Sequence, residues 1–233
     1  QAYAEEAERS DARRAVVAAL VVHVIIRTRF YDDYLRAATH AGCRQVVLLA
    51  AGLDTRAFRL DWPAGVRLFE IDLPDVLAFK DRVLTDQDAQ SRCDRTAIGA
   101  DLTGDWPASL ARAGFRPDRP AAWLVEGLLV YLTATDAGRL LTEVSALAAP
   151  GSRLSCEQGR SVAQLATATS QAGATEATSL WQGGLGDETM AFLEAKGWET
   201  QSRDLRSVAA DYGHSVAEGT TSGFVTARRR PTG

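Results

Sequence analysis

The sequence has too few cysteines and histidines to suggest a metal site or a disulfide framework. Its three cysteines, Cys43, Cys93 and Cys156, lie far apart and form no Cys-x-x-Cys motif. The three histidines are equally scattered, at positions 23, 40 and 214. We therefore predict no bound metal ion and no histidine-based catalytic pair, and the cysteine usage fits a reduced, cytoplasmic setting.

Long hydrophobic runs are also absent. The longest, residues 15–26 (AVVAALVVHVII), contains His23, whereas a membrane-spanning helix needs roughly twenty apolar residues. Arg13 and Arg14 precede this run as in a signal peptide, but acidic residues come before them and no A-x-A site follows. We expect a buried helix here and no membrane partner.

Neither sign of charge is in large excess. Lys and Arg total 26 and Asp and Glu total 30, which gives a formal net charge of −4. Because proteins that bind nucleic acid generally carry strong positive charge, we expect a small-molecule partner and no nucleic acid. A chain of 233 residues with 46% hydrophobic and 24% charged residues is typical of one folded domain. Its oligomeric state is not indicated.

Short β-branched runs alternate with longer helical segments. The runs are residues 45–51, 66–72, 95–101, 121–126 and 152–157. This alternation is typical of βαβ units in a parallel sheet. The first run, QVVLLAA, is continuously apolar, which indicates a central strand covered on both faces. With terminal strands at 198–202 and 223–227, we predict an α/β fold with a seven-stranded, mostly parallel sheet and helices on both faces.

The remaining segments give a domain layout. We expect a single domain with a helical cap at 1–41, a cofactor-binding core at 42–157, a substrate lid at 158–190 and C-terminal strands at 191–233. Predicted helices cover 12–41 (one or two helices), 75–84, 133–149 and 187–195. The lid is proposed because 163–186 is rich in Ala, Thr, Ser, Gln and Gly. Arg228, Arg229 and Arg230 are expected to form a solvent-exposed tail.

Chemically specific residues follow the predicted strands, where ligands bind in such sheets. Asp72 comes about 20 residues after the small-residue turn at 50–55. In Rossmann-type sheets this is the spacing of the acidic residue that accepts hydrogen bonds from the ribose hydroxyls of a nucleotide. That turn has Ala50, Gly52 and Thr55 where a dinucleotide fingerprint has three glycines. Acidic residues gather near the same edge: Asp54, Glu70, Asp72, Asp101 and Glu126. They favour a cationic nucleoside, and S-adenosyl-L-methionine, a sulfonium with an ammonium group, fits.

Five motifs in order resemble one known family. They are RTRFYDD (27–33), LAAGLDTR (49–56), FEIDLP (69–74), GADL (99–102) and EGLLVYL (126–132). The set resembles the leucine carboxyl methyltransferase family, more closely its bacterial, S-adenosylmethionine-dependent branch, which includes polyketide O-methyltransferases of secondary metabolism. The resemblance implies a class I methyltransferase fold, Rossmann-like in topology.

The resemblance also implies roles for individual residues. Arg27 matches the arginine that pairs with the methionyl carboxylate of the cofactor. Glu126 matches an acid near its ammonium and sulfonium groups. Asp72, with Leu73 beside it, matches the ribose-binding acid. Because surface pairing with Asp32 or Asp33 is the structural alternative for Arg27, and helix capping that for Asp72, these roles are expectations.

The resemblance also implies which residues contact the adenine and which form the turn beside the cofactor. Asp101 and Leu102 match the pair that recognises adenine, although Asp101 also fits a helix N-cap. Ala50 and Gly52 match the turn that lies against the methionyl and ribose groups. The family usually has glycine at the position of Ala50, so this methyl group is expected to crowd the cofactor.

The sequence offers no convincing general base, which favours an acceptor that is already ionised. A carboxylate meets this condition near neutral pH, so we predict O-methylation of a carboxylate, or of a phenol, on a small apolar or aromatic molecule. Tyr131 is predicted to lie beside the acceptor as the catalytic residue, and Asp54 is expected to bond Arg56. The alternatives are a nucleotide-dependent oxidoreductase on the same fold and a cofactor-binding protein without methyl transfer.

Overall fold

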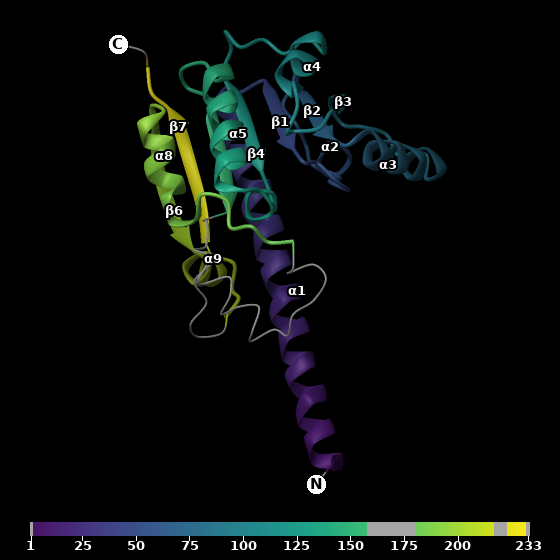
Figure 1. The fold of residues 1–233 in the computed structure, drawn as a ribbon. Coiled ribbons are helices and arrows are strands. Elements are labelled where there is room, and N and C mark those ends of the chain that lie inside the picture. The colour runs from purple at the N-terminus through teal and green to yellow at the C-terminus, as the bar shows by residue number, and fades with distance from the viewer. Residues whose placement is uncertain (1, 158–179, 217–222, 232–233) are drawn as a thin grey trace.

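The sheet is the frame on which the candidate site is built. The computed structural model describes the backbone of residues 2–157, 180–216 and 223–231, and side chains from residue 21 onward within those ranges. The described residues form one seven-stranded sheet in the order β3-β2-β1-β4-β5-β7-β6 (Figure 1). Strands β1 to β5 pair in parallel, and β7 runs antiparallel to both β5 and β6. The predicted fold class is confirmed.

The strands begin and end close to the predicted limits. They are β1 Gln45–Leu49, β2 Arg67–Asp72, β3 Asp94–Gly99, β4 Ala121–Val125, β5 Arg153–Glu157, β6 Trp198–Asp204 and β7 Gly223–Arg229. All residues of β1 and β4 are buried, as continuous apolarity predicts for central strands. The prediction of an arginine tail is wrong for Arg228 and Arg229, which belong to β7, whereas the predicted solvent exposure holds for Arg228 and Arg230. Arg229 donates to the Lys196 carbonyl and lies 5.7 Å from the Trp198 ring centroid.

The helices follow the strands in the alternation expected. They are α1 Ala2–His40, α2 Arg56–Arg59, α3 Pro74–Asp86, α4 Trp106–Arg112, α5 Ala134–Leu147, α8 Thr189–Ala195 and α9 Leu205–Asp211, with 3₁₀ turns η1 Leu129–Tyr131 and η2 Gly186–Glu188. The N-terminal segment is one helix rather than two. Thr133, Asp105 and Asp204 each accept a capping hydrogen bond at a helix start.

Two hydrophobic cores hold the helices on the sheet. One contains Trp106, Trp123 and Trp198 and lies under α4, α5 and α8. The other lies on the opposite face, under α1 and α9. Figure 1 shows α5 and α8 on one side of the sheet and α1 on the other, with the N-terminus of α1 projecting away from the sheet. Phe30 of α1 stacks on Phe224 of β7 with ring centroids 4.2 Å apart, which ties the first helix to the last strand.

The predicted substrate lid falls mostly outside the described residues, which do not include 158–179. Its described end, residues 182–184, bonds to the segment that contains Tyr131: Gln182 donates its backbone N–H to the Val130 carbonyl at 2.7 Å and its side-chain amide to the Tyr131 carbonyl at 2.9 Å. The four-part domain layout stays a prediction. In the part of the chain that is described, no helix has the length and apolarity needed to cross a membrane.

Candidate functional site

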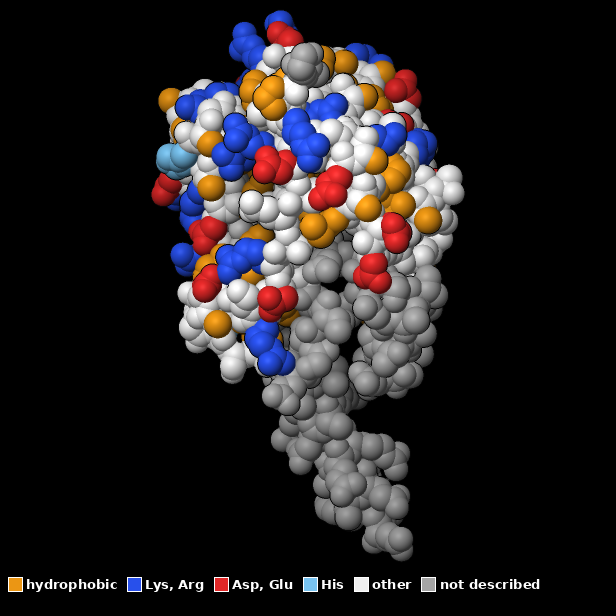
Figure 2. Space-filling model, turned by 90° about the vertical axis from the view of Figure 1, so that its left-hand side faces the viewer, with side chains coloured by type: hydrophobic (Ala, Val, Ile, Leu, Met, Phe, Trp, Pro, Cys, Tyr) orange, Lys and Arg blue, Asp and Glu red, His pale blue; other side chains and the backbone are white. Residues whose placement is uncertain are grey.

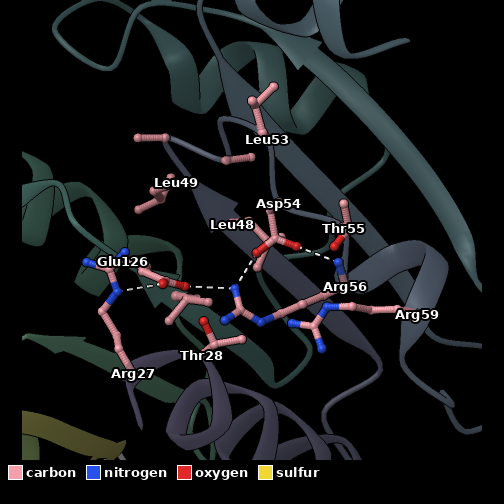
Figure 3. Close-up of a pocket in the computed structure, with 13 residues that line it drawn as sticks. Arg27, Thr28, Leu48, Leu49, Leu53, Asp54, Thr55, Arg56, Arg59 and Glu126 are labelled. Atoms are coloured by element: carbon pink, nitrogen blue, oxygen red, sulfur yellow. Dashed lines mark hydrogen bonds and ion pairs between the residues drawn. The ribbon is translucent and has the colours of Figure 1, made fainter. Parts of the chain in front are cut away.

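The predicted site residues gather at one edge of the sheet. Since β1 to β5 are parallel, their carboxyl ends meet at that edge. A cavity of about 330 Å³ opens there, lined by residues of α1, β1, the following turn, α2 and β4. Its polar lining residues are Arg27, Thr28, Asp54, Thr55, Arg56, Arg59 and Glu126, most of which point toward one another in Figure 3.

The turn after β1 is joined to the end of β2 by a carboxylate. Asp72 accepts one hydrogen bond from the Gly52 N–H at 2.6 Å and another from the Leu73 N–H at 2.7 Å. Each oxygen therefore has one backbone donor and retains a further lone pair. The N-cap position of α3 is Leu73 rather than Asp72, so the capping alternative for Asp72 is not what the structure shows.

Ala50 takes a backbone conformation that favours glycine. Its φ is +54°, and that of Gly52 is +47°. A left-handed alanine costs about 1 kcal/mol relative to its preferred conformation. The cavity-lining turn therefore requires two left-handed residues, and this chain supplies glycine at only one of them.

Arg56 is the buried centre of the ionic network. Its side chain is 3% exposed, and it bonds Asp32 at 2.8 Å, Glu126 at 2.7 Å and Asp54. The predicted bond between Asp54 and Arg56 is confirmed. Burial alone lowers the pKa of Arg56, but the nearby carboxylates of Asp54 and Glu126 outweigh it and raise that pKa. Arg56 therefore stays charged and holds three segments together.

Asp32 pairs with two arginines of α2. It accepts from Arg56 at 2.8 Å and from Arg59 Nη2 at 2.8 Å. Burial raises the pKa of Asp32, but the hydrogen bonds from Arg59 and Arg56 have the larger combined effect and lower it. Asp32 was expected only as a surface partner for Arg27, so its buried pairing with α2 was not predicted.

Arg27 reaches the cavity from α1 and contacts two acids on neighbouring strands. Its Nε lies 2.9 Å from Glu126 Oε1, and its Nη1 lies 3.4 Å from Glu157 Oε1. The alternative pairing with Asp32 or Asp33 is therefore not observed, and Asp33 instead accepts from Arg29 at 2.9 Å.

Glu157 is a second acid that sequence reasoning missed. It ends β5, and the Gly127 N–H donates to its two oxygens at 2.9 and 2.8 Å. Burial raises the pKa of Glu157 despite these bonds and the nearby Arg27. Its place at a strand end, like those of Asp72 and Glu126, was the signal that could have found it.

Tyr31, another residue of α1, has a buried hydroxyl group. The residue is 0% exposed, and its oxygen has no hydrogen-bond partner among the described residues. Burial, followed by the charge of Glu157, raises the pKa of Tyr31 well above its ordinary value. The phenol therefore stays neutral.

Glu70 does not belong to the site. It is 0% exposed and accepts from Lys80 at 2.7 Å and from Arg95 at 2.8 Å. Its expected place among the acids of the cleft is wrong, because it lies inside β2 rather than at the end and faces α3.

Of the predicted site residues, only Arg27, Ala50 and Glu126 line the cavity, and the others lie outside its lining: Gly52, Asp72, Leu73, Asp101, Leu102 and Tyr131. Asp101 accepts from the Thr103 N–H at 2.7 Å, and this bond lowers its pKa. It is not a helix N-cap, because that position of α4 belongs to Asp105. Tyr131 is 40% exposed in η1. Their roles toward adenine and acceptor stay predictions, as do those of the other predicted site residues.

The arrangement suits an organic ligand with charged groups of both signs. Three guanidiniums face four carboxylates: Arg27, Arg56, Arg59, Asp32, Asp54, Glu126 and Glu157. Among the described residues, no group of three or more His, Cys, Asp or Glu side chains is arranged to hold a metal ion. The cavity instead offers paired charges beside a small-residue turn that is bonded to Asp72.

Comparison with known sequences points to one family. The model of the leucine carboxyl methyltransferase family matches residues 1–145. A protein of Parafrankia sp. (strain EAN1pec), named as an S-adenosyl-L-methionine-dependent methyltransferase, is 50% identical over 211 residues, which are 89% of this chain and 68% of that protein. A protein of Streptomyces avermitilis with the same kind of name is 42% identical over 213 residues, covering 89% of this chain and 75% of that protein.

Solved structures with the same fold are more distant in sequence. A methyltransferase of Thermobifida fusca YX has a TM-score of 0.65 at 18% identity, over 91% of this chain and 82% of that one. Magnesium protoporphyrin IX methyltransferase of Synechocystis PCC 6803, solved with bound SAH, has a TM-score of 0.55 at 13% identity, over 92% of this chain and 84% of that one. These likenesses show the class I methyltransferase fold. Together with the strand-end motifs and the family match, they establish that the chain belongs to the leucine carboxyl methyltransferase family.

Proposed function

We propose that this protein transfers the methyl group of S-adenosylmethionine to a carboxylate oxygen of a small apolar or aromatic molecule and so forms a methyl ester. Its family and its relatives show that the chain is an S-adenosylmethionine-dependent methyltransferase. We propose in addition that the acceptor atom is an oxygen, that this oxygen belongs to a carboxylate, and that the acceptor is a small molecule.

The residues at the sheet edge fit the cofactor. Arg27 is the cationic group at the cavity that can pair with the methionyl carboxylate, and Glu126 beside it can accept from the ammonium group. Asp72 is held by two backbone donors and has lone pairs left for both ribose hydroxyls. Ala50 and Gly52 bring the backbone, rather than a long side chain, toward the cavity.

The reaction requires mainly that the protein align the methyl donor with the acceptor. S-adenosylmethionine supplies a methyl group on a sulfonium centre, whose transfer disperses positive charge. The chain must hold that centre in line with the acceptor oxygen and exclude water. Arg56 fixes the wall of the cavity for this purpose, because it is 3% exposed and joins α1, the β1 turn and β4 through three carboxylates.

One observation favours a carboxylate acceptor over a phenol. The cavity lining contains no histidine, lysine or cysteine in the described part of the chain, so no neutral base is at hand to deprotonate a phenol. A carboxylate needs no such base, because it is ionised near neutral pH.

The proposal is tested by product analysis. The full chain is incubated with methyl-deuterated S-adenosylmethionine and matched sets of aromatic acids, phenols and amides, and products are identified by mass spectrometry. We expect labelled methyl esters from acids only. Labelled phenyl ethers alone would reject the carboxylate assignment, and cofactor that binds without being consumed would support the non-methylating alternative. The Asp72→Ala variant, with a weakened cofactor site, is the control for background methylation.

A further inference from the structure

A second cavity lies away from the sheet edge that carries the cofactor residues. It has a volume of about 640 Å³, is open to solvent on one side, and is lined by α1, the region after α9, and the strands β5, β7 and β6. Its apolar and aromatic wall includes Phe30, Tyr34, Ala37 and Tyr212. The proposed methyl transfer uses none of these side chains.

Two arginines on adjacent strands face this cavity together. Arg153 of β5 and Arg228 of β7 are direct partners in the antiparallel register, so their side chains lie on the same face of the sheet. That face is the α1 side, because Phe224 of the same strand stacks on Phe30. Like charges directly opposite each other destabilise a sheet unless something neutralises them.

No ion pair holds either of these two arginines in the described part of the chain. Within the described residues, neither guanidinium has a carboxylate oxygen within the 4.0 Å of an ion pair. Glu199 is the register partner of Arg228 on β6, yet no ion pair joins them. The other charges of the lining are already engaged, since Asp33 is bonded to Arg29, and Arg203 to Asp211.

The unpaired positive charge is local to the cavity rather than part of a basic surface. The face shown in Figure 2 carries basic and acidic side chains interspersed over its described part, without a patch of one sign. A macromolecular polyanion would need an extended basic surface. A pair of guanidinium forks beside aromatic rings instead suits one small acid group on a ring.

We propose that this cavity is a binding site for a small organic anion, namely a carboxylate or phosphate ester that carries a ring. Its acid group binds the guanidiniums of Arg153 and Arg228 at the same time. Tyr34 and Tyr212 contact the ring. Tyr34 also donates its hydroxyl to the Trp123 carbonyl of β4 at 3.0 Å. A ligand here therefore contacts α1 on the same helix that carries Arg27 to the first cavity.

The site is tested by calorimetric titration of the full chain with phenyl phosphate. Saturating S-adenosylhomocysteine is present throughout, so that the arginines of the first cavity do not contribute. We expect Arg153→Gln and Arg228→Gln each to raise the dissociation constant about tenfold, the effect of losing one charge-assisted bond. Glu199→Gln removes a repulsive charge and is expected to lower it about threefold.

The matched control is Arg112→Gln, which removes an exposed arginine of α4, on the other face of the sheet. It is expected to leave the dissociation constant unchanged. The expected change in the dissociation constant is a decrease for Glu199→Gln and an increase for the arginine variants. The proposal can therefore still be tested if an arginine variant fails to fold. Absence of binding at millimolar phenyl phosphate, or equal affinity in all variants, would overturn the proposal. So would a wild-type dimer that the two arginine substitutions dissociate, since a second copy would then occupy the cavity.

Discussion

The carboxylate of Asp72 accepts a hydrogen bond of 2.6 Å from the backbone N–H of Gly52. This bond joins the end of β2 to the turn after β1, so the acid and the turn have a fixed relative position. Both residues were predicted to contact the cofactor on separate grounds, one from its place at a strand end and one from its turn. Their direct contact means that the two residues proposed for the ribose and methionyl parts of the cofactor form one connected unit.

Replacing Asp72 with alanine is expected to weaken binding of S-adenosylhomocysteine by about 1–3 kcal/mol, because hydrogen-bonding groups lose their partner. Isothermal titration calorimetry measures this directly. Asp75→Ala, which removes an exposed carboxylate three residues further along in α3, is the matched control and should bind normally. Unchanged affinity in the Asp72 variant would mean that the cofactor lies elsewhere.

Ala50→Gly is expected to stabilise the protein by about 0.5–1 kcal/mol, because glycine adopts a φ of +54° without the steric penalty of alanine. Urea unfolding gives the difference in free energy. Ala51→Gly is the matched control, since Ala51 is not among the residues with positive φ and should lose stability on the same change. A destabilised Ala50 variant would contradict this account of the turn.

Asp32→Asn is expected to lower the free energy of unfolding by about 3 kcal/mol near neutral pH, as when one partner of a buried ion pair is lost. Because the pKa of Asp32 is lowered in the fold, its contribution is present above its ordinary value of 3.8 and is lost as pH falls through the lower, folded value. Urea unfolding from acid to neutral pH should therefore show a flatter acid limb in the variant.

The control for Asp32 is Asp61→Asn, which removes a carboxylate that is 93% exposed in its pair with Arg92. Surface pairs contribute little, so this variant should follow the wild-type curve. A parallel loss in both variants would show that the buried position of Asp32 has no special role.

Tyr131→Phe is expected to leave cofactor affinity unchanged and to slow methyl transfer about tenfold, the effect of one lost hydrogen bond to the acceptor. Single-turnover measurement with the acid identified by product analysis checks the rate. Thr142→Val removes an exposed hydroxyl of α5 that bonds the Gly138 carbonyl at 2.7 Å, away from both cavities, and should react normally. Full activity of the Tyr131 variant would remove that residue from the site.

The strand ends could be predicted from the sequence because local patterns determine them. Continuous apolarity marked β1, and its neighbours followed from the βαβ alternation, so the residues after each strand were known to share an edge. Glu70 was assigned to that edge wrongly because the pattern gives strand membership and not depth within the strand. Two residues nearer the end, Asp72 reaches the edge, whereas Glu70 meets Lys80 and Arg95.

The contacts that complete the site could not be predicted, because they join distant segments. Arg27 meets Glu157 across 130 positions, and Arg56 meets Glu126 across 70. Each arginine has several acids nearby in sequence, and only the packing of α1 against the sheet selects among them. Arg228 and Arg229 were predicted to form a tail for the same reason. Their pairing partners lie on β5 and β6, which are other segments of the chain, so the sequence around the arginines does not indicate that β7 extends to Arg229.

The stacking of Phe30 on Phe224 bears on how the protein is made. Phe30 lies less than one helical turn after Arg27, and Phe224 belongs to β7, so the ring that packs on this part of α1 is synthesised after the five parallel strands β1 to β5. The nascent chain can pair its central strands long before that point. The helix that carries Arg27, however, gains its stacking contact only after β7 has been synthesised, so the cavity at the sheet edge is completed later than the pairing of the central strands.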